Sequence, residues 1–126
     1  MIIGTGVDVV EISRFRKTIE RLKDRFILRI FTDAEQRFCN EHRDPVPHFA
    51  ARFAAKEALF KALGTGWAKG VTWLDAEVLR ERQDAPVMQL HGEAGRLSAE
   101  KGARKIHISL SHTDQWAVAV VILEGQ

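Results

Sequence analysis

The 126-residue sequence has a single cysteine, Cys39. One thiol excludes an internal disulfide and a cysteine-rich zinc site, and such sparse use of cysteine suits a reducing cytoplasm. No apolar run approaches the ~18 to 20 residues needed to cross a bilayer. Asp8 also interrupts the apolar start of the chain too early for a secretory signal peptide. We therefore expect a cytoplasmic protein that does not enter the membrane.

The chain also has little excess charge of either sign. Its 19 basic and 17 acidic residues give a formal net charge of +2. This balance lacks the overall basic character of nucleic-acid-binding proteins, so we expect no nucleic-acid partner, and any basic patch has to be local. Hydrophobic residues make up 45% and charged residues 29% of the chain, as in ordinary globular proteins. At this length we expect residues 1–126 to form one domain with one core.

A helix from 49 to 63 is the strongest secondary-structure signal in the chain. Nearly every residue of this segment is a good helix former or an aromatic, and Gly64 follows where a left-handed cap residue is favoured, with Gly66 just beyond. Winding the segment at about 100° per residue predicts one apolar stripe that faces the core. A second face is formed by small side chains that allow another backbone to come close: Ala51, Ala55 and Ala62.

The third face of this helix carries Glu57 and Lys61, one turn apart, and it is otherwise formed by Ala50, Ala54 and Ala58. A carboxylate and an ammonium at this spacing usually form a solvated ion pair of small energetic value. The surrounding alanines, however, leave space beside the pair for a ligand. The residues alone leave both interpretations open.

Residues 2–10 are predicted to form a strand because of their β-branched content. Alternation places Asp8 on the same face as Gly4 and Gly6, which leaves a bare strip of backbone beside a carboxylate. Two glycines followed by an acid are only a weak dinucleotide-binding signal, since the third glycine and the helix-opening context are absent. Asp8 is either a buried acid paired with a helix N-terminus or a ligand-binding residue. We favour the ligand role because a lone acid among valines and isoleucines needs a strong partner.

A short helix is expected from Ser13 onward. Its outer side carries a stripe of basic residues, formed by Arg14, Lys17 and Arg21, and by Arg25 if the helix continues. Like charges on one helix face are usually just solvated surface. Because few acids relieve this stripe, docking of an acidic partner is the alternative interpretation.

The remaining segments are predicted to be short helices and antiparallel strands. Thr32 and Glu35 have the spacing of a capping box, so a helix is expected from there to about residue 42. Strands at 71–74, 76–80 and 87–90, with a turn at 83–86, a helix at 92–101 and final strands at 106–112 and 116–123 complete the pattern. His112 falls at a strand end, where a solvated residue is the ordinary case and a binding residue is the alternative.

Asp8 and Glu57 are two carboxylates on different predicted elements, with no histidine or cysteine cluster near them in the sequence. Hard oxygen ligands without soft ones suit Mg²⁺, which takes one or two protein carboxylates and completes its coordination with water and phosphate oxygens. Lys61, Arg52 and His112 are available as cationic or hydrogen-bonding groups for such phosphates. These residues therefore indicate phosphoryl-type chemistry on a diphosphate.

Three motifs together resemble the holo-[acyl-carrier-protein] synthases, the small bacterial phosphopantetheinyl transferases. The first is Gly4, Gly6 and Asp8 followed by Glu11 and Ile12; the second is the block RFAAKEALFKALGTG from Arg52 to Gly66; the third is Ser109, Ser111 and His112. The likeness extends over essentially the whole chain in the same order, although residues 75–104 add no motif.

The resemblance implies transfer of the 4′-phosphopantetheine arm of coenzyme A to a serine of apo acyl carrier protein, with release of adenosine 3′,5′-bisphosphate, in support of fatty acid biosynthesis. It also implies a single-domain α+β fold, with a mostly antiparallel sheet packed against the long central helix. A homotrimer with sites between neighbouring subunits is expected by the same likeness. Since the nucleophile belongs to the carrier, no reactive serine or cysteine is required in this chain.

By the same likeness, Asp8 and Glu57 hold Mg²⁺ against the diphosphate of coenzyme A, and Lys61 steadies the charge of the transferred phosphate. Either Glu57 or a metal-bound water takes the serine proton. Coenzyme A is expected to lie against Arg52, Lys61, Gly64, Ser111 and His112, with Arg52 and His112 near the adenosine 3′-phosphate. Because carrier proteins are strongly acidic, the basic stripe is expected to dock them through Arg14, Lys17 and Arg21.

Two functions from other classes remain as alternatives, ranked below the transferase. A binding module that holds coenzyme A or another nucleotide without reaction would use the same phosphate-binding groups, and it predicts metal-independent binding with no product. A structural or interaction domain would use Glu57 and Lys61 as a mere surface pair. It predicts no ligand-induced change in melting temperature.

Overall fold

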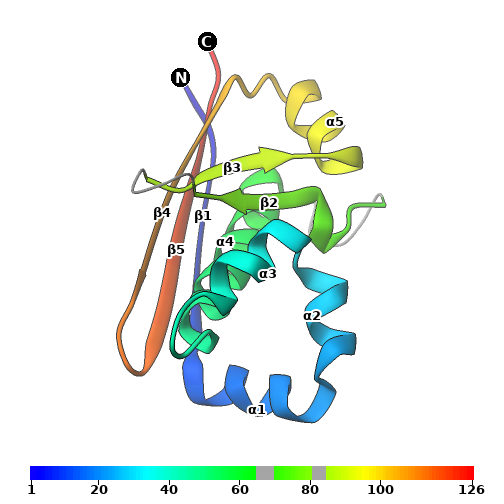
Figure 1. Ribbon diagram of the computed structural model, residues 1–126. Coiled ribbons are helices and arrows are strands. Elements are labelled where there is room, and N and C mark those ends of the chain that lie inside the picture. The colour runs from blue at the N-terminus through cyan, green and yellow to red at the C-terminus, as the bar shows by residue number, and fades with distance from the viewer. Residues whose placement is uncertain (65–69, 81–84) are drawn as a thin grey trace.

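A three-stranded antiparallel sheet packs against one long helix, and shorter helices and a hairpin surround this helix (Figure 1). The computed structural model describes residues 1–64, 70–80 and 85–126. In chain order the elements are β1 (Ile2–Glu11), α1 (Ile12–Leu22), α2 (Asp24–Ile30), α3 (Asp33–Asn40), α4 (Val46–Leu63), the 3₁₀ helix η1 (Trp73–Asp75), β2 (Ala76–Leu79), β3 (Val87–Leu90), α5 (Gly92–Glu100), β4 (Lys105–His112) and β5 (Trp116–Glu124). The predicted α+β class is confirmed.

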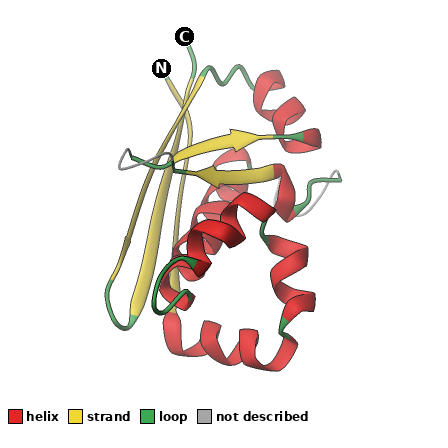
Figure 2. Ribbon diagram, in the orientation of Figure 1, coloured by secondary structure: helices red, strands yellow, loops and turns green. Residues whose placement is uncertain are grey.

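The sheet has the strand order β1-β5-β4, and its strands run side by side along one side of the molecule (Figure 2). Side chains of β4 alternate as predicted, because Ile106, Ile108 and Leu110 pack against the core while the intervening residues are exposed. The opposite face of the sheet exposes large apolar side chains: Val7, Val9, Trp116 and Val120. A second sheet consists of the predicted hairpin of β2 and β3.

Two glycines allow α4 to lie directly on β1. A Cβ at Gly4 would collide with the carbonyl oxygen of Ala62, and a Cβ at Gly6 would collide with that of Ala58. The glycine strip is therefore covered by helix backbone rather than left bare. The alanines on the third face of the helix are fully buried: Ala50, Ala54 and Ala58. The space that they were expected to leave for a ligand is filled by this packing.

The long helix begins three residues earlier than predicted, at Val46. Pro47 lies in the first turn, where the N–H that proline lacks has no intrahelical partner, so the helix tolerates it. His48, predicted to precede the helix, is part of this turn. The predicted C-terminus is confirmed, because Gly64 adopts the left-handed conformation with a φ of 73°. Gly66 and residues 83 and 84 of the predicted turn lie outside the described residues.

A buried ion pair joins α3, α4 and β2. The Lys56 ammonium donates to Glu35 Oε1 at 2.8 Å and to the carbonyl oxygen of Ala76 at 2.6 Å, and both charged side chains are fully buried. Glu35 also accepts from the backbone N–H of Thr32, which completes the predicted capping box, and from that of Val78. Each charge is thus satisfied, as burial in an apolar core requires.

Two further segments differ from the sequence-based predictions. Residues 71–74 form no strand; Thr72 and Asp75 instead cap a 3₁₀ turn that precedes β2. The helix that begins at Ile12 does not continue to Arg25, because Lys23 has a φ of 52° and the chain turns a corner there into α2. None of the helices in the described part of the chain has the length and apolar character of a membrane span.

Candidate functional site

Asp8, Glu57 and Lys61 lie together where β1 runs beside α4. The Lys61 ammonium donates to Asp8 Oδ1 and to the carbonyl oxygen of Val7, both at 3.0 Å. The lysine therefore pairs with the strand, and the ion pair that was expected between Lys61 and Glu57 is absent from the salt bridges of the described residues. This geometry follows from the close approach of β1 to α4 at Gly6, which brings the strand within reach of the lysine.

Glu57 is half-buried, and burial raises the pKa of its carboxyl above the ordinary value. The nearby Asp8 carboxylate raises this pKa further, whereas Lys61 lowers it. Both acids line an open pocket of about 370 Å³, together with a third acid, Glu11 of β1, and with Arg14 of α1 and Phe26 of α2. Two carboxylates that repel each other in this way favour a cation between them.

The donor set suits a hard divalent cation. Asp8 and Glu57 offer carboxylate oxygens from two rigid elements, and Mg²⁺ usually takes one or two such ligands and leaves its other positions to water and phosphate. Across residues 1–64, 70–80 and 85–126, no group of three or more histidine, cysteine, aspartate or glutamate side chains is arranged to hold a metal. The two acids therefore fit an ion whose coordination is completed by a phosphate ligand.

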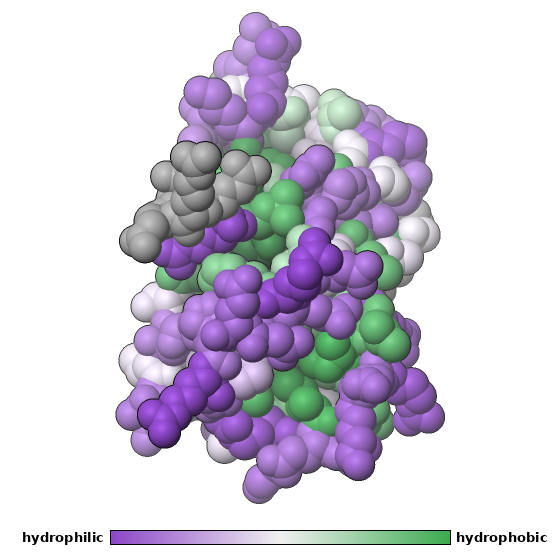
Figure 3. Space-filling view, in the orientation of Figure 1, coloured by the Kyte–Doolittle hydropathy of each residue, from purple (hydrophilic) through white to green (hydrophobic). Residues whose placement is uncertain are grey.

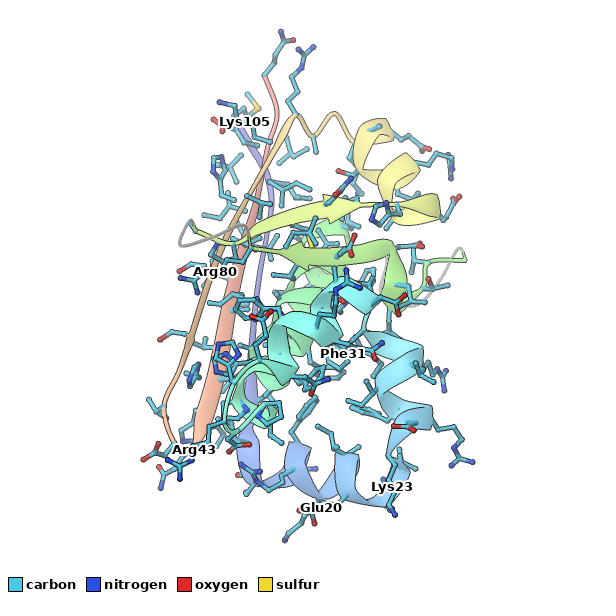
Figure 4. All side chains as sticks on the ribbon, in the orientation of Figure 1. Glu20, Lys23, Phe31, Arg43, Arg80 and Lys105 are labelled. Atoms are coloured by element: carbon cyan, nitrogen blue, oxygen red, sulfur yellow. The ribbon has the colours of Figure 1, made fainter. Side chains whose placement is uncertain are left out.

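A second pocket, of about 300 Å³, lies between α4, β4 and the end of β2. Arg52, Ser111 and His112, predicted to bind the same ligand, come together here from distant parts of the sequence. Figure 4 shows Arg80 beside β4, and this residue also lines the pocket. No acidic side chain of the described residues lines it, so the pocket is cationic and suits an anion.

Arg52 gives the strongest indication of that anion. The residue is only 3% exposed, and its guanidinium carbon lies 4.0 Å from the centre of the Phe38 ring. Its Nε is buried without a hydrogen-bond partner within the described part of the chain. Burial lowers the pKa of the guanidinium, and neighbouring Arg80 contributes in the same direction. A buried donor without a partner is unfavourable, and phosphate or carboxylate oxygens would satisfy it.

Among the lining residues that the sequence did not reveal as part of a site are Phe38, His48 and Arg80. His48 precedes Arg52 by four residues, so the helical period would have placed both on one face if the helix had been started at Val46. Phe38 and Arg80 reach the pocket from α3 and from the end of β2. No local pattern in the sequence indicates that these two elements meet.

The carboxylate pocket and the cationic pocket share no lining residue. Gly64, which was expected to contact the ligand, lines neither of them. It serves as the C-terminal cap of α4, and beyond its chain neighbours no atom of the described residues lies within 4 Å of where its Cβ would be. Its contact with a ligand stays a prediction.

Basic and apolar residues border the carboxylate pocket on the side of α1. Arg14, Lys17 and Arg21 are exposed, as predicted, and Arg14 also lines the pocket. An apolar pocket of about 920 Å³ continues between α1, α2 and η1, with Phe26 and Phe53 lining both spaces. In the space-filling view it lies where a green hollow is rimmed by hydrophilic side chains (Figure 3). A partner with acidic and apolar surface would complement this region.

Comparison with known proteins places the chain in a family. Residues 4–121 match the family model of the 4′-phosphopantetheinyl transferase superfamily. The holo-[acyl-carrier-protein] synthase of Koribacter versatilis is 53% identical over 124 residues, which cover 98% of this chain and 99% of the relative.

Solved structures agree with the sequence relatives. Holo-[acyl-carrier-protein] synthase from Neisseria meningitidis has a TM-score of 0.88 at 30% identity, over 98% of this chain and 99% of that one. The synthase from Bacillus anthracis, in complex with CoA (3′,5′-ADP), has a TM-score of 0.81 at 34% identity, over 100% and 99%. From its sequence, fold and relatives, this chain belongs to the 4′-phosphopantetheinyl transferase superfamily.

Proposed function

We propose that this protein transfers the 4′-phosphopantetheine arm of coenzyme A to a serine of apo acyl carrier protein and releases adenosine 3′,5′-bisphosphate. The observation that carries the proposal is the meeting of Asp8 and Glu57 in one pocket beside the Lys61 ammonium. Support comes from relatives named holo-[acyl-carrier-protein] synthase and from the coenzyme A complexes of the Bacillus anthracis and Helicobacter pylori structures.

Asp8 and Glu57 are the residues that would hold Mg²⁺. When bound, the ion supplies positive charge that neutralises the coenzyme A diphosphate during transfer. The Lys61 ammonium lies 3.0 Å from Asp8 Oδ1 and is therefore held beside the proposed ion site. It stabilises the charge that develops on the transferred phosphate. Such a site works by positioning and electrostatics rather than by a nucleophile of its own.

The serine of the carrier supplies that nucleophile. As its Oγ forms a bond to the phosphorus that bears pantetheine, its proton passes to the Glu57 carboxylate or to water, and the bond from this phosphorus to the oxygen of adenosine 3′,5′-bisphosphate breaks. The chain's contribution is to hold the two substrates in line. The cationic pocket would anchor the nucleotide, with Arg52 and His112 at the 3′-phosphate and the Ser111 hydroxyl at the pocket edge.

The basic stripe and the apolar pocket beside it would receive the carrier. Arg14, Lys17 and Arg21 face solvent on α1 and complement a strongly acidic protein. Arg14 is both a stripe residue and a lining residue of the carboxylate pocket. Docking on this face therefore brings the carrier's serine next to the transferred phosphate.

We also infer that the protein works in the cytoplasm, in fatty acid biosynthesis, and without nucleic acid.

We further infer that the protein assembles as a homotrimer. Support for assembly comes from the outer face of the sheet, which exposes four large apolar side chains by 38% or more each: Val7, Val9, Trp116 and Val120. Contiguous apolar surface of this kind favours burial between subunits. Sites between neighbouring subunits would then unite the carboxylate pocket of one chain with the cationic pocket of the next. Sedimentation equilibrium at the mass of three chains is the expected result.

The intact mass of an apo acyl carrier protein tests the reaction. After incubation with this protein, coenzyme A and Mg²⁺, the carrier is expected to gain the mass of one phosphopantetheine. The gain should disappear when the metal is chelated. Tight binding of coenzyme A without any gain in mass, across several carriers, would instead identify a binding module.

A further inference from the structure

Three imidazoles form a continuous stack beside Arg52, and the proposed reaction accounts for only one of them. The rings of His42 and His48 are stacked with centroids 3.5 Å apart and an interplanar angle of 22°. His48 in turn meets His112 edge to face, with centroids 5.1 Å apart. His48 and His112 both line the cationic pocket, whereas His42 packs on His48 and is not among the lining residues.

The outer imidazole of the stack has a defined proton. His42 Nδ1 lies 3.0 Å from the carbonyl oxygen of Phe38. Because a carbonyl oxygen only accepts hydrogen bonds, this nitrogen has to be protonated and donate. His42 consequently presents a fixed ring face to His48.

Charged groups face His48 from each neighbouring element. Arg52 on α4 and Arg80 after β2 line the same pocket. Asp44, in the loop after α3, is the opposing charge, but Arg16 on α1 engages both of its carboxylate oxygens at 2.7 and 3.2 Å. The surroundings of His48 are thus predominantly cationic.

Burial and these neighbours fix the protonation state of His48. Desolvation, followed by His42, His112 and Arg52, lowers the pKa of His48 to about 4, against the opposing effect of Asp44. At neutral pH the imidazole is therefore neutral. An anion in the pocket would replace repulsion from the arginines with attraction and would favour the imidazolium.

We propose that His48 is a specificity-determining residue for the 3′-phosphate of the nucleotide, which this pocket binds together with a proton taken up by His48. The inference rests on the proposed function and goes beyond it, because it assigns His48 and couples recognition to protonation. A nucleotide without that phosphate gains no imidazolium contact. Proton uptake therefore favours the phosphorylated ligand over its dephosphorylated form, and by linkage the affinity falls as pH rises.

Calorimetric titration with adenosine 3′,5′-bisphosphate, in the absence of Mg²⁺ and near neutral pH, tests this coupling. Comparing two buffers of different ionisation enthalpy measures the number of linked protons. We expect net proton uptake, and an affinity that falls with increasing pH by up to about tenfold per unit for one linked proton. Adenosine 5′-monophosphate, which lacks the 3′-phosphate, should bind without linked protons.

Two variants separate titration from shape. His48→Phe keeps an aromatic ring in the stack, and His48→Gln keeps a polar group. Both variants should lose the proton uptake and bind the bisphosphate roughly tenfold more weakly. Their binding of the monophosphate should be unchanged. His91→Gln is the matched control, because His91 is exposed and bonded to Glu77, and it lines no part of this pocket. A merely structural role for His48 would weaken both nucleotides alike.

The unmodified protein supplies a measurement that needs no variant. The imidazole resonance of His48 followed by NMR should titrate at higher pH when the bisphosphate is bound than when the protein is free. Bisphosphate binding without proton uptake, or uptake that survives in both His48 variants, would overturn the inference while the mass assay of the carrier still succeeds. Failure to bind the bisphosphate together with failure to modify any carrier would overturn the proposed function itself.

Discussion

Asp8 and Glu57 each contribute one carboxylate to a pocket that neither element forms alone. Asp8→Asn and Glu57→Gln are each expected to lower kcat for carrier modification by at least about 10²-fold, since either change replaces an anionic carboxylate with a neutral amide at the proposed ion site. The melting temperature of Glu57→Gln should be unchanged or raised, because the raised pKa of Glu57 shows that folding disfavours its charged form.

Steady-state kinetics and thermal melts at several Mg²⁺ concentrations check this prediction. Glu100→Gln provides the matched control, because Glu100 is an exposed carboxylate paired with Arg96 on α5. A variant of Asp8 or Glu57 with ordinary activity at ordinary Mg²⁺ would show that the residue does not hold the ion.

The buried ion pair of Lys56 and Glu35 affects the stability of the fold rather than catalysis. Lys56→Met leaves the Glu35 carboxylate buried without its ammonium, so the free energy of unfolding is expected to fall by about 3 to 5 kcal/mol. Urea denaturation measures the change. Arg96→Ala, which breaks only surface ion pairs on α5, should leave the midpoint of urea denaturation unchanged. Similar midpoints for both variants would mean that the buried pair contributes no more than a surface pair.

The contact between β1 and α4 belongs to the scale of elements. Gly6→Ala introduces a Cβ that collides with the carbonyl oxygen of Ala58, so strand and helix have to separate, at an expected loss of about 1 to 3 kcal/mol in unfolding free energy. Gly95→Ala on α5, where a Cβ would meet only ordinary contacts of 3.7 Å or more, should cause no such loss. Since the separation also moves Asp8 from Lys61, Gly6→Ala should lose activity under conditions where it remains folded. Full stability and activity would mean that the close approach is dispensable.

The basic stripe is a property of α1 as an element. Arg14→Glu and Arg21→Glu reverse charges on the exposed side, and we expect each to raise KM for the acyl carrier protein by about tenfold, with KM for coenzyme A unchanged at Arg21. The effect should diminish at high salt. Arg96→Glu on α5 serves as a charge-matched control. Equal increases in KM for both substrates on changing Arg21 would exclude a docking face.

The pH dependence of stability concerns the whole molecule. The pKa of His48 is about 4 in the fold and has an ordinary value of 6.5. The unfolded chain therefore binds this proton at higher pH than the native protein does, and acidification favours unfolding. The contribution of His48 to the free energy of unfolding is fully present above pH 6.5 and is lost as the pH falls towards 4. The difference in melting temperature between wild type and His48→Phe should change across this window, and a constant difference would contradict the depressed pKa.

Local sequence patterns determined most elements of this protein and the residues of its chemistry. Gly64 ends α4 because a left-handed residue is needed there, and Thr32 with Glu35 starts α3 through a capping box. Both signals act within a few residues, so they can be recognised in the sequence. The alternation in β4 and the exposed basic residues of α1 are local in the same sense. The motifs around Asp8, Glu57 and His112 likewise allowed the family to be identified.

The tertiary structure alone decided which of these residues meet. Lys61 pairs with Asp8 rather than with its helical neighbour Glu57, because two glycines let β1 come within reach of it. Lys56 is buried against Glu35, although lysine is usually a surface residue. His48 stands between His42 and His112 because α3, α4 and β4 converge. Such partners lie far apart along the chain, and their choice depends on packing and on the burial of charge, which no local periodicity encodes.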